Sequence, residues 1–254
     1  MPSREFNSPR VHNLGKWLLK TNDFMPGASV SGQVVKNQVF IGCPWKVVRP
    51  KYIRISQKLE HKFPISFVII GREPEHNAQE LLELIKRKLL SSSAAIFDVT
   101  GGNANVSLEF GIAHASEVSS ALYISMRKSG IIGASGTIIS DLAGQVRKTY
   151  KTEAGLLRLL TEFCGNHNFT KLFEKSLKRV TKSFTKGRKR QMRTLALRIF
   201  HELDSKVRYR REDLVQTLRA ADYSESDIER LLDRFKQDRL LQVTAGRYSE
   251  VMLV

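Results

Sequence analysis

The chain has 254 residues, 41% of them hydrophobic, and a formal net charge of +17. That apolar fraction excludes a chain that is disordered throughout, and the one-sided charge indicates a polyanionic partner, above all nucleic acid. The two cysteines lack metal-ligand spacing, and no apolar run reaches membrane-spanning length, so we expect a cytoplasmic protein without a disulfide framework, a zinc site or a membrane partner.

Four parts follow one another along the chain. Residues 1–36 are predicted to be an extension that packs on the next domain, with one short helix over residues 13–20. Residues 37–165 form the main domain, residues 166–190 a basic helical linker, and residues 191–254 a small C-terminal domain. The lengths of the second and fourth parts are ordinary for folded units.

The main domain alternates between strands and helices. We predict strands at residues 39–41, 65–70, 94–97 and 121–126, and helices at residues 50–59, 77–90, after Asn103 and at 154–163. Residues 130–137 are rich in glycine and are predicted to be a mobile loop over the strand ends. The alternation predicts an α/β domain with a Rossmann-like or flavodoxin-like parallel sheet and right-handed crossovers.

Residues 94–113 are the most informative segment. Residues 94–97 are a short apolar run, typical of a strand covered on both faces, and Asp98 stands at its end. Gly101 and Gly102 predict a sharp turn, Asn103 predicts a helix N-cap, and Glu109 lies within the first turns of the helix that follows. Because open α/β sheets bind ligands at the carboxyl ends of their strands, we expect these residues to share one site.

This segment resembles the nucleoside 2-deoxyribosyltransferase-like proteins and their relatives, the TIR-like nucleotide-binding domains. Their shared pattern is an apolar strand ending in Asp, a turn of small residues and a Glu-containing helix, here at residues 97–98, 101–103, 105–106 and 109–113. Residues 39–45 look like the family's first strand and loop, and residues 140–144 with Tyr150 are similar to a late segment of TIR-like members. The resemblance covers residues 37–165.

The resemblance implies an enzyme that cleaves an N-glycosidic bond. A carboxylate beneath the ribose C1′ stabilises the positive charge that develops there or attacks it, as in retaining glycosidases. Glu109 takes that role, and Asp98 or Asn103 would bind the ribose hydroxyls or the leaving base. No cofactor is expected, because NAD, a nucleoside or a nucleotide would be the substrate.

Further residues are assigned to substrate binding. The backbone N–H groups of Gly101 and Gly102 and the helix start, with Asn103 and Asn105, could hold a phosphate. Trp45 could stack on a base, and the cations expected near the phosphates are Lys46, Arg49 and Arg72.

Each assignment has a structural alternative. Glu109 could serve the helix macrodipole alone, and Asp98 could only end its strand through a turn bond. Asn103 could be only a cap, and Trp45 could belong to the core.

The linker and the C-terminal domain carry the positive charge. Residues 166–190 contain one acid, Glu174, and much of this segment is predicted to be a basic helix that ends near Gly187. A solvated face and contact with phosphates are both consistent with such a run. Residues 191–254 resemble a winged helix-turn-helix domain, with helices at 192–203, 212–220 and 224–238 and a wing hairpin at 240–244 and 247–253.

The third of these helices mixes acids with bases, so it would read a DNA groove poorly because acids repel phosphates. This domain could instead bind a protein or a second copy of the chain. Nucleic acid, either DNA or a structured RNA–DNA element, would then contact the linker and nearby arginines, namely Lys178, Arg179, Lys182, Lys186, Arg188, Lys189, Arg208, Arg210, Arg211 and Arg247.

Two functions remain open. The first is an N-glycosidase, resembling the effectors of bacterial retrons and other antiphage systems, in which a complex of nucleic acid and protein, including a reverse transcriptase, restrains a toxic domain. The second is a transcriptional regulator that senses a nucleotide without cleaving it. Asp98 and Glu109 favour the enzyme, whereas Asn103, where the transferases carry an acid, favours the sensor.

Overall fold

The computed structural model describes residues 34–46, 48–71, 78–127, 130–131, 147–204, 209–244 and 249–253. The predicted N-terminal helix, residues 140–144, Arg72, Arg208 and Arg247 lie outside these ranges. Among the described residues, none of the helices combines the length and the apolarity that a bilayer crossing needs.

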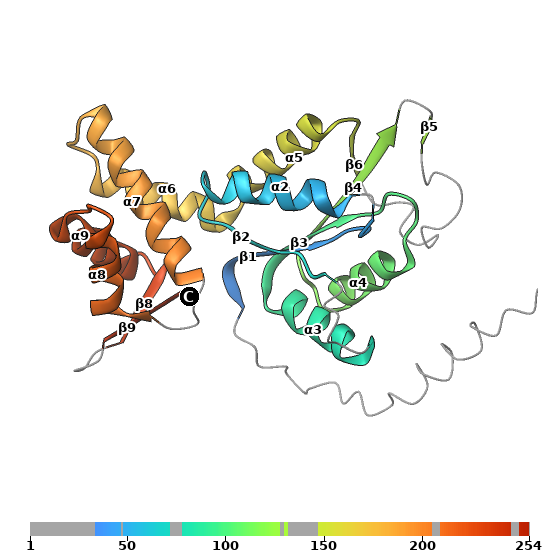
Figure 1. The fold of residues 1–254 in the computed structure, drawn as a ribbon, viewed down its shortest axis with the longest axis horizontal. Helices are drawn as coiled ribbons and strands as arrows, with labels where there is room; N and C mark the ends of the chain where they lie inside the picture. The colour runs from blue at the N-terminus through green and yellow to red at the C-terminus, as the bar shows by residue number, and fades with distance from the viewer. Residues whose placement is uncertain are drawn as a thin grey trace, which may run out of the picture. The chain divides into compact units, whose positions relative to one another are not determined.

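A parallel sheet of five strands forms the centre of the first half (Figure 1). Its members are β1 (Val35–Gly42), β2 (Ser66–Val68), β3 (Ser92–Asp98), β4 (Ser120–Arg127) and β6 (Arg147–Tyr150). They run in the order β2-β1-β3-β4-β6, and the short β5 (Gly130–Ile131) pairs antiparallel with β4. This is the strand order of flavodoxin-like sheets, so the predicted α/β architecture with a parallel sheet is confirmed.

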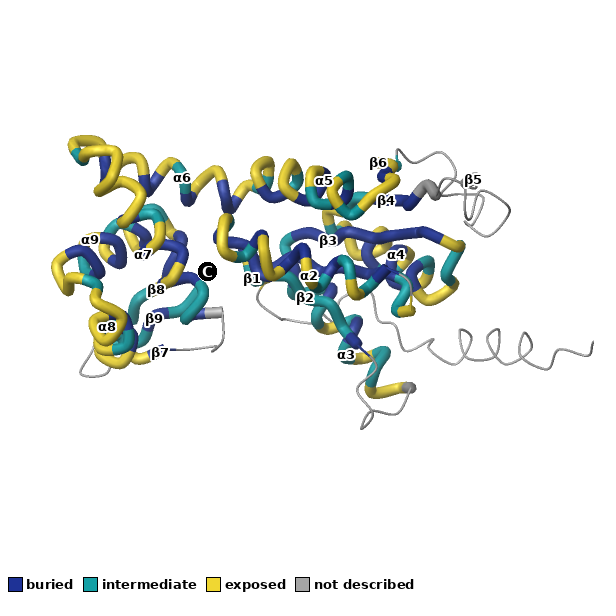
Figure 2. Tube along the Cα trace, turned by 45° about the horizontal axis from the view of Figure 1, so that its top comes forward, coloured by how far each residue is buried: buried dark blue, intermediate teal, exposed yellow. Residues whose placement is uncertain are grey.

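Helices cover both faces of the sheet, as Figure 1 shows: α2 (Arg49–Glu60) and α5 (Glu153–Asn166) lie on one face, and α3 (Ala78–Leu90) and α4 (Ala104–Ala115) on the other. Six of the seven residues of β3 are therefore buried, and Figure 2 shows the central strands as the most buried part of this half. On the α3–α4 face, Phe97 packs edge-on against Phe110 of α4, with ring centroids 5.4 Å apart.

The second half is built from helices and a small antiparallel sheet. Its elements are α6 (Asn168–Val180), α7 (Lys186–Asp204), β7 (Tyr209–Arg210), α8 (Arg211–Ala220), α9 (Glu225–Gln237), β8 (Leu241–Val243) and β9 (Glu250–Leu253). The strands have the order β7-β9-β8. Phe200 of α7 lies at the centre of the core, with ring centroids 5.6 Å from Phe173 and 5.2 Å from Phe235. The apolar face of α6 therefore belongs to the core of this half.

The predicted basic helix is present as α6, but its predicted end near Gly187 is wrong. α6 ends at Val180, and α7 begins at Lys186, so that Gly187 lies in its first turn. Thr185 marks the new start, because its Oγ1 accepts a hydrogen bond from the Arg188 N–H at 3.4 Å. The charged segment is thus a helical hairpin.

Candidate functional site

A cavity of about 400 Å³ opens at the carboxyl ends of β1 and β3. The chain leaves β1 toward β2 on one side and leaves β3 toward β4 on the other, so this is the switch point at which flavodoxin-like sheets bind ligands. The cavity is lined by the loop after β1 and by the turn and helix after β3: Cys43, Pro44, Trp45, Lys46, Thr100, Gly101, Asn103, Asn105, Val106 and Glu109.

Glu109 is a buried acid in the wall of this cavity. It lies in the second turn of α4, only 8% exposed, and its Oε2 has no hydrogen-bond partner among the described residues. Burial raises the pKa of its carboxyl from 4.5 to about 7. At neutral pH the group is therefore divided between its ionised and its protonated form.

The turn before α4 needs its two glycines. Gly101 and Gly102 have φ values of +76° and +60°, in the left-handed region that other residues rarely adopt. Asn103 then caps the helix, because its Oδ1 accepts hydrogen bonds from the N–H groups of Asn105 at 3.0 Å and Val106 at 3.3 Å. The predicted cap is confirmed, and these two N–H groups, which we had considered for phosphate, are bonded to it.

Asp98 lies behind the cavity wall and not in it. It is fully buried, and its Oδ2 accepts hydrogen bonds from the hydroxyls of Tyr52 at 3.0 Å and Tyr150 at 2.6 Å. Its Oδ1 accepts the N–H of Thr100 at 3.0 Å. Burial, and then the charge of Asp98, raise the pKa of both tyrosines well above the ordinary range, so both remain donors.

The Asp98 cluster fixes one wall of the cavity indirectly. Thr100 lines the cavity, and its Oγ1 accepts the N–H of Ser125 at 2.8 Å. Asp98 thus holds the residue that begins the glycine turn, and the structure does not bring its carboxyl to the substrate side with Glu109. The sequence does not predict that Tyr52 and Tyr150 bind Asp98, although Tyr150 stands in one of the segments that resemble the TIR-like domains.

The loop after β1 supplies the opposite wall. Trp45 is half-buried and Lys46 is exposed, and both line the cavity as predicted for residues that would meet a base and a phosphate. Burial, followed by the charges of Asp98 and Glu109, raises the pKa of Cys43 to about 12, so its thiol stays protonated. Arg49 does not line the cavity, but its buried Nε has no partner among the described residues.

Several arginines that we predicted to bind nucleic acid are engaged by acids. Arg179 pairs with Asp238 at 2.9 Å, Arg188 with Asp227 at 2.5 Å, and Arg211 with Glu229. Arg210 lies in β7 opposite Glu250 of β9. Lys178, Lys182, Lys186 and Lys189 are exposed and make no ion pair with any residue the structure describes.

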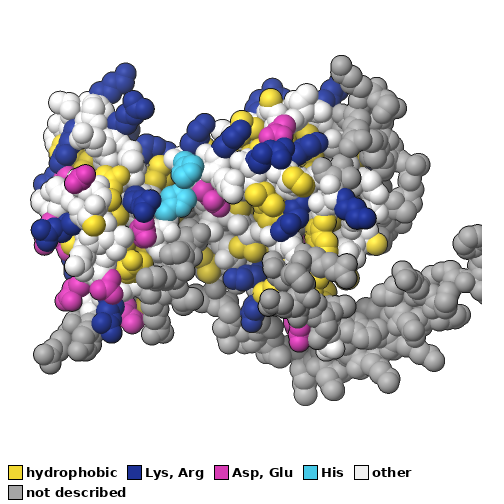
Figure 3. Space-filling view, in the orientation of Figure 1, with side chains coloured by type: hydrophobic (Ala, Val, Ile, Leu, Met, Phe, Trp, Pro, Cys, Tyr) yellow, Lys and Arg dark blue, Asp and Glu magenta, His cyan; other side chains and the backbone are white. Residues whose placement is uncertain are grey.

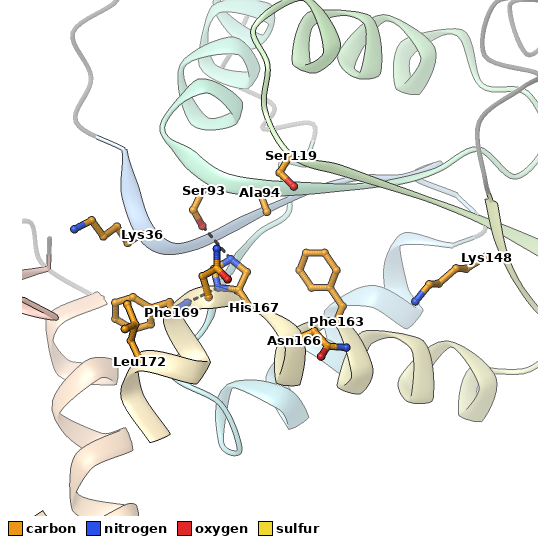
Figure 4. A pocket seen from close by; sticks show the side chains of 11 residues that line it. Lys36, Ser93, Ala94, Ser119, Lys148, Phe163, Asn166, His167, Phe169 and Leu172 are labelled. Carbon is orange, nitrogen blue, oxygen red and sulfur yellow. Dashed lines mark hydrogen bonds between the residues drawn. The ribbon is translucent and has the colours of Figure 1, made fainter. Parts of the chain in front are cut away.

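A second and larger cavity, of about 550 Å³, lies at the opposite, amino end of the strands (Figure 4). It is lined by Lys36, Ser93, Ala94, Ser119, Lys148, Phe163, Asn166, His167, Asn168, Phe169 and Leu172. No sequence signal pointed to it, because its residues come from the starts of strands and from the junction of α5 and α6.

The tautomer of His167, in this second cavity, follows from its contacts. Nδ1 accepts the N–H of Phe169 at 3.2 Å, so Nε2 carries the proton that it donates to Ser93 Oγ at 3.2 Å. Ser93 in turn donates to the carbonyl of Gln38 at 2.9 Å. His167 is therefore a neutral N-cap of α6, which leaves Glu109 as the candidate for chemistry.

Comparison with known proteins does not assign a family, so the site is interpreted from its geometry. No family model matches the chain, and no curated protein matches it. Within the described residues, no group of three His, Cys, Asp or Glu side chains is arranged to hold a metal ion.

Proposed function

We propose that this protein cleaves the N-glycosidic bond of NAD, a nucleotide or a nucleoside, with Glu109 beneath the ribose C1′. The observation that carries the proposal is the buried Oε2 of Glu109, which lacks a hydrogen-bond partner among the described residues and lines a cavity at the switch point of the sheet. Burying a carboxyl without a partner costs several kcal/mol of desolvation, and such groups with a perturbed pKa concentrate at functional sites.

The chemistry follows from one ionised carboxylate. The bond between C1′ and the base breaks, the base leaves with the bonding electrons, and C1′ becomes positive. Glu109 stabilises that charge or forms a bond to C1′. Water then adds to C1′, which breaks any bond to Glu109, and the proton that the water loses goes to the solvent or, for a purine or pyrimidine, to the base. A cavity of about 400 Å³ lies in the range that small ligands occupy. Trp45 would stack on the base, and Lys46 would meet a phosphate.

The leaving group narrows the choice of substrate. Glu109 is the one carboxyl among the described residues that line the cavity, and the Cys43 thiol, with a pKa of about 12, is a poor acid. A carboxylate that attacks C1′ cannot also protonate the base. Nicotinamide leaves NAD as a neutral molecule without needing a proton, whereas a purine or pyrimidine leaves better when protonated. NAD is therefore the favoured substrate.

The second half of the chain supports a second candidate, a nucleotide sensor that regulates transcription. The succession α7-β7-α8-α9-β8-β9, with β9 in the middle of the small sheet, is the arrangement expected of a winged helix. Acids of the α9 segment pair with Arg179, Arg188 and Arg211 of the same chain, so these ion pairs hold α9 within its own half. If the protein is instead the N-glycosidase, we propose by resemblance that this half binds the partner, such as a reverse transcriptase, that restrains the toxic domain.

One experiment distinguishes the N-glycosidase from the nucleotide sensor. The full chain is incubated with NAD, ATP, adenosine and thymidine, free base is measured by chromatography, and binding is measured in parallel by calorimetry. We expect nicotinamide release from NAD by the wild type and none by Glu109→Gln. Binding of a nucleotide without release of base would establish the sensor, and neither binding nor release would refute both.

A further inference from the structure

A row of lysines runs along the exposed side of α6. Lys171, Lys175 and Lys178 follow one another at spacings of four and three residues, and Lys182 continues the row in the turn after the helix. Residues three and four apart lie on the same face of a helix, so the first three share one face and cover about 10 Å. The opposite side of α6 carries the buried residues Phe169, Phe173 and Leu177.

The start of α7 extends this positive surface. Lys186, Lys189 and Arg190 lie in its first turns and are exposed, at spacings of three and four residues. We call these seven cations the lysine face. Figure 2 shows the α6–α7 turn among the exposed parts of the chain, and in Figure 3 Lys and Arg side chains project from the end of this hairpin.

The cations of this hairpin differ in whether they form ion pairs. Arg179 and Arg188 turn toward Asp238 and Asp227 of the α9 segment, and Arg193 pairs with Glu174, the one acid of α6. None of the seven cations of the lysine face has an ion-pair partner among the described residues. The acids of this region are therefore used by arginines, and the lysine face keeps its charge for an external anion.

The lysine face leads into the second cavity. Leu172, next to Lys171 and 46% exposed, belongs both to the outer side of α6 and to the lining of that cavity. Lys36 and Lys148 also line it, and Lys148 is paired with Glu162 at 2.7 Å. Figure 4 shows Phe163 pointing from α5 into the space between the two lysines. An aromatic ring beside cations is the combination that holds an unstacked base and its phosphate.

We propose that the lysine face and the second cavity bind single-stranded nucleic acid, the lysines contacting successive phosphates and the cavity receiving a base against Phe163. This goes beyond the cleavage assigned to Glu109, because it lies at the opposite end of the sheet and needs no catalysis. A single strand is favoured over a duplex because only an unpaired base can enter a cavity. Binding is independent of sequence, since phosphates and an aromatic ring accept every base.

The test measures binding of the full chain to a fluorescein-labelled oligothymidylate of about 20 nucleotides, and to a duplex of equal length, by fluorescence anisotropy. The stripe variant replaces Lys171, Lys175, Lys178 and Lys182 by Gln. We expect it to weaken binding at least tenfold and to flatten the slope of log affinity against log salt by about 3. The matched control replaces four exposed lysines elsewhere, Lys58, Lys62, Lys151 and Lys236, and removes the same total charge.

The cavity is tested separately. Phe163→Leu keeps an apolar side chain but removes the stacking ring, and Leu172→Gln alters the exposed rim without touching the core. We expect Phe163→Leu to weaken the single-stranded complex about fivefold or more, Leu172→Gln to weaken it in the same direction, and both to leave duplex binding unchanged.

Equal losses in the stripe and control variants would overturn the proposal, because total charge alone would then explain binding. Tighter binding to the duplex, or sedimentation with phosphatidylserine vesicles without binding to either oligonucleotide, would overturn it as well. The second of these results would assign the lysine face to an acidic membrane surface.

Discussion

Gly42, the last residue of β1, leaves the space that the Glu109 carboxyl occupies. A β-carbon added to Gly42 would collide with Oε2 of Glu109 and would lie 2.7 Å from Cδ1 of Phe97. Phe97 is fully buried in the core and cannot retreat, whereas the end of the glutamate side chain can turn. The absence of a side chain at Gly42 therefore leaves room for the Glu109 carboxyl in the cavity wall.

We predict that Gly42→Ala abolishes base release and also destabilises the fold, because the clash with Phe97 remains when the glutamate turns away. The new methyl group displaces the carboxyl from the position beneath C1′, and overpacking of this kind costs about 1–3 kcal/mol of unfolding free energy. Base release and urea unfolding are measured on the same preparation. Gly111→Ala, in the same helix as Glu109, is the matched control, because a β-carbon there meets nothing within 4 Å.

The control variant is expected to change stability in the opposite direction. Alanine in place of an exposed helical glycine stabilises a protein by about 0.5–1 kcal/mol, so Gly111→Ala should unfold at a higher urea concentration and keep full activity. If Gly42→Ala were as active as the wild type, the close contact with Glu109 would have no bearing on the reaction.

The raised pKa of Glu109 predicts a stability that falls as pH rises. The folded protein holds the proton up to about pH 7, whereas the unfolded chain releases it near 4.5, so the folded state binds more protons between these values. Stability is therefore lost across this window, and the full loss is about 3 kcal/mol. Glu109→Gln has no such proton, and we expect it to be more stable than the wild type at pH 8 and nearly equal to it at pH 4. Thermal melts at several pH values check this.

The same titration identifies the reactive form of Glu109. If the carboxylate acts at C1′, base release from NAD rises with pH through about 7 and then levels off. A rate that falls through the same range would show that the protonated form donates to the leaving base. Flat activity across this range would mean that Glu109 takes no part in the reaction as an acid, a base or a nucleophile.

The sequence predicted the helix after the glycine turn and its cap, because local spacing decides these elements. The helical period placed Val106, Phe110 and Ala113 on the buried face of α4, and Asn103 at its start marked the cap. Nothing local marked β6, whose four residues are polar except for one, and it is held by pairing with β4. Its last residue, Tyr150, belongs to the resemblance to TIR-like domains, but that resemblance does not predict its hydrogen bond to Asp98.

Contacts between residues that are distant in sequence account for the other differences between the predictions and the structure. Asp98 receives its hydroxyl donors from residues 46 and 52 positions away, and Arg179 finds its acid 59 positions further along the chain. A charge run that contains a single acid, Glu174, looks unpaired in the sequence. The fold brings acids of the α9 segment to Arg179 and Arg188 and leaves the lysines and Arg190 exposed.

We predict that Tyr150→Phe weakens the fold and the reaction together. It removes the 2.6 Å hydrogen bond to Asp98 and leaves a fully buried carboxyl with one donor fewer, at a cost of about 1–3 kcal/mol. Thr100 then loses part of its anchorage, so base release should fall without being abolished. Asp98→Asn should be more harmful to stability, because an amide NH₂ in place of Oδ2 would no longer accept the protons that the Tyr52 and Tyr150 hydroxyls donate. A Tyr150→Phe variant that unfolds at the wild-type urea concentration would contradict this account.

The neutral state of His167 predicts a weak point at the start of α6 under acidic conditions. Burial lowers the pKa of this histidine, and its Nδ1 must stay free of a proton to accept the Phe169 N–H. Between the lowered folded pKa and the unfolded pKa of about 6.5, the unfolded chain binds more protons than the folded protein. This contribution to stability is therefore complete above pH 6.5 and is lost as pH falls through the folded pKa.

His167→Asn keeps a side chain that caps helices well but does not titrate, and we expect it to remove this part of the acid sensitivity while matching the wild type at pH 8. His167→Ala should instead cost about 1 kcal/mol at pH 8 through loss of the cap. Melting curves of the three proteins between pH 4.5 and 8 test the prediction, and parallel curves for the wild type and His167→Asn would show that the proton on His167 does not govern this helix.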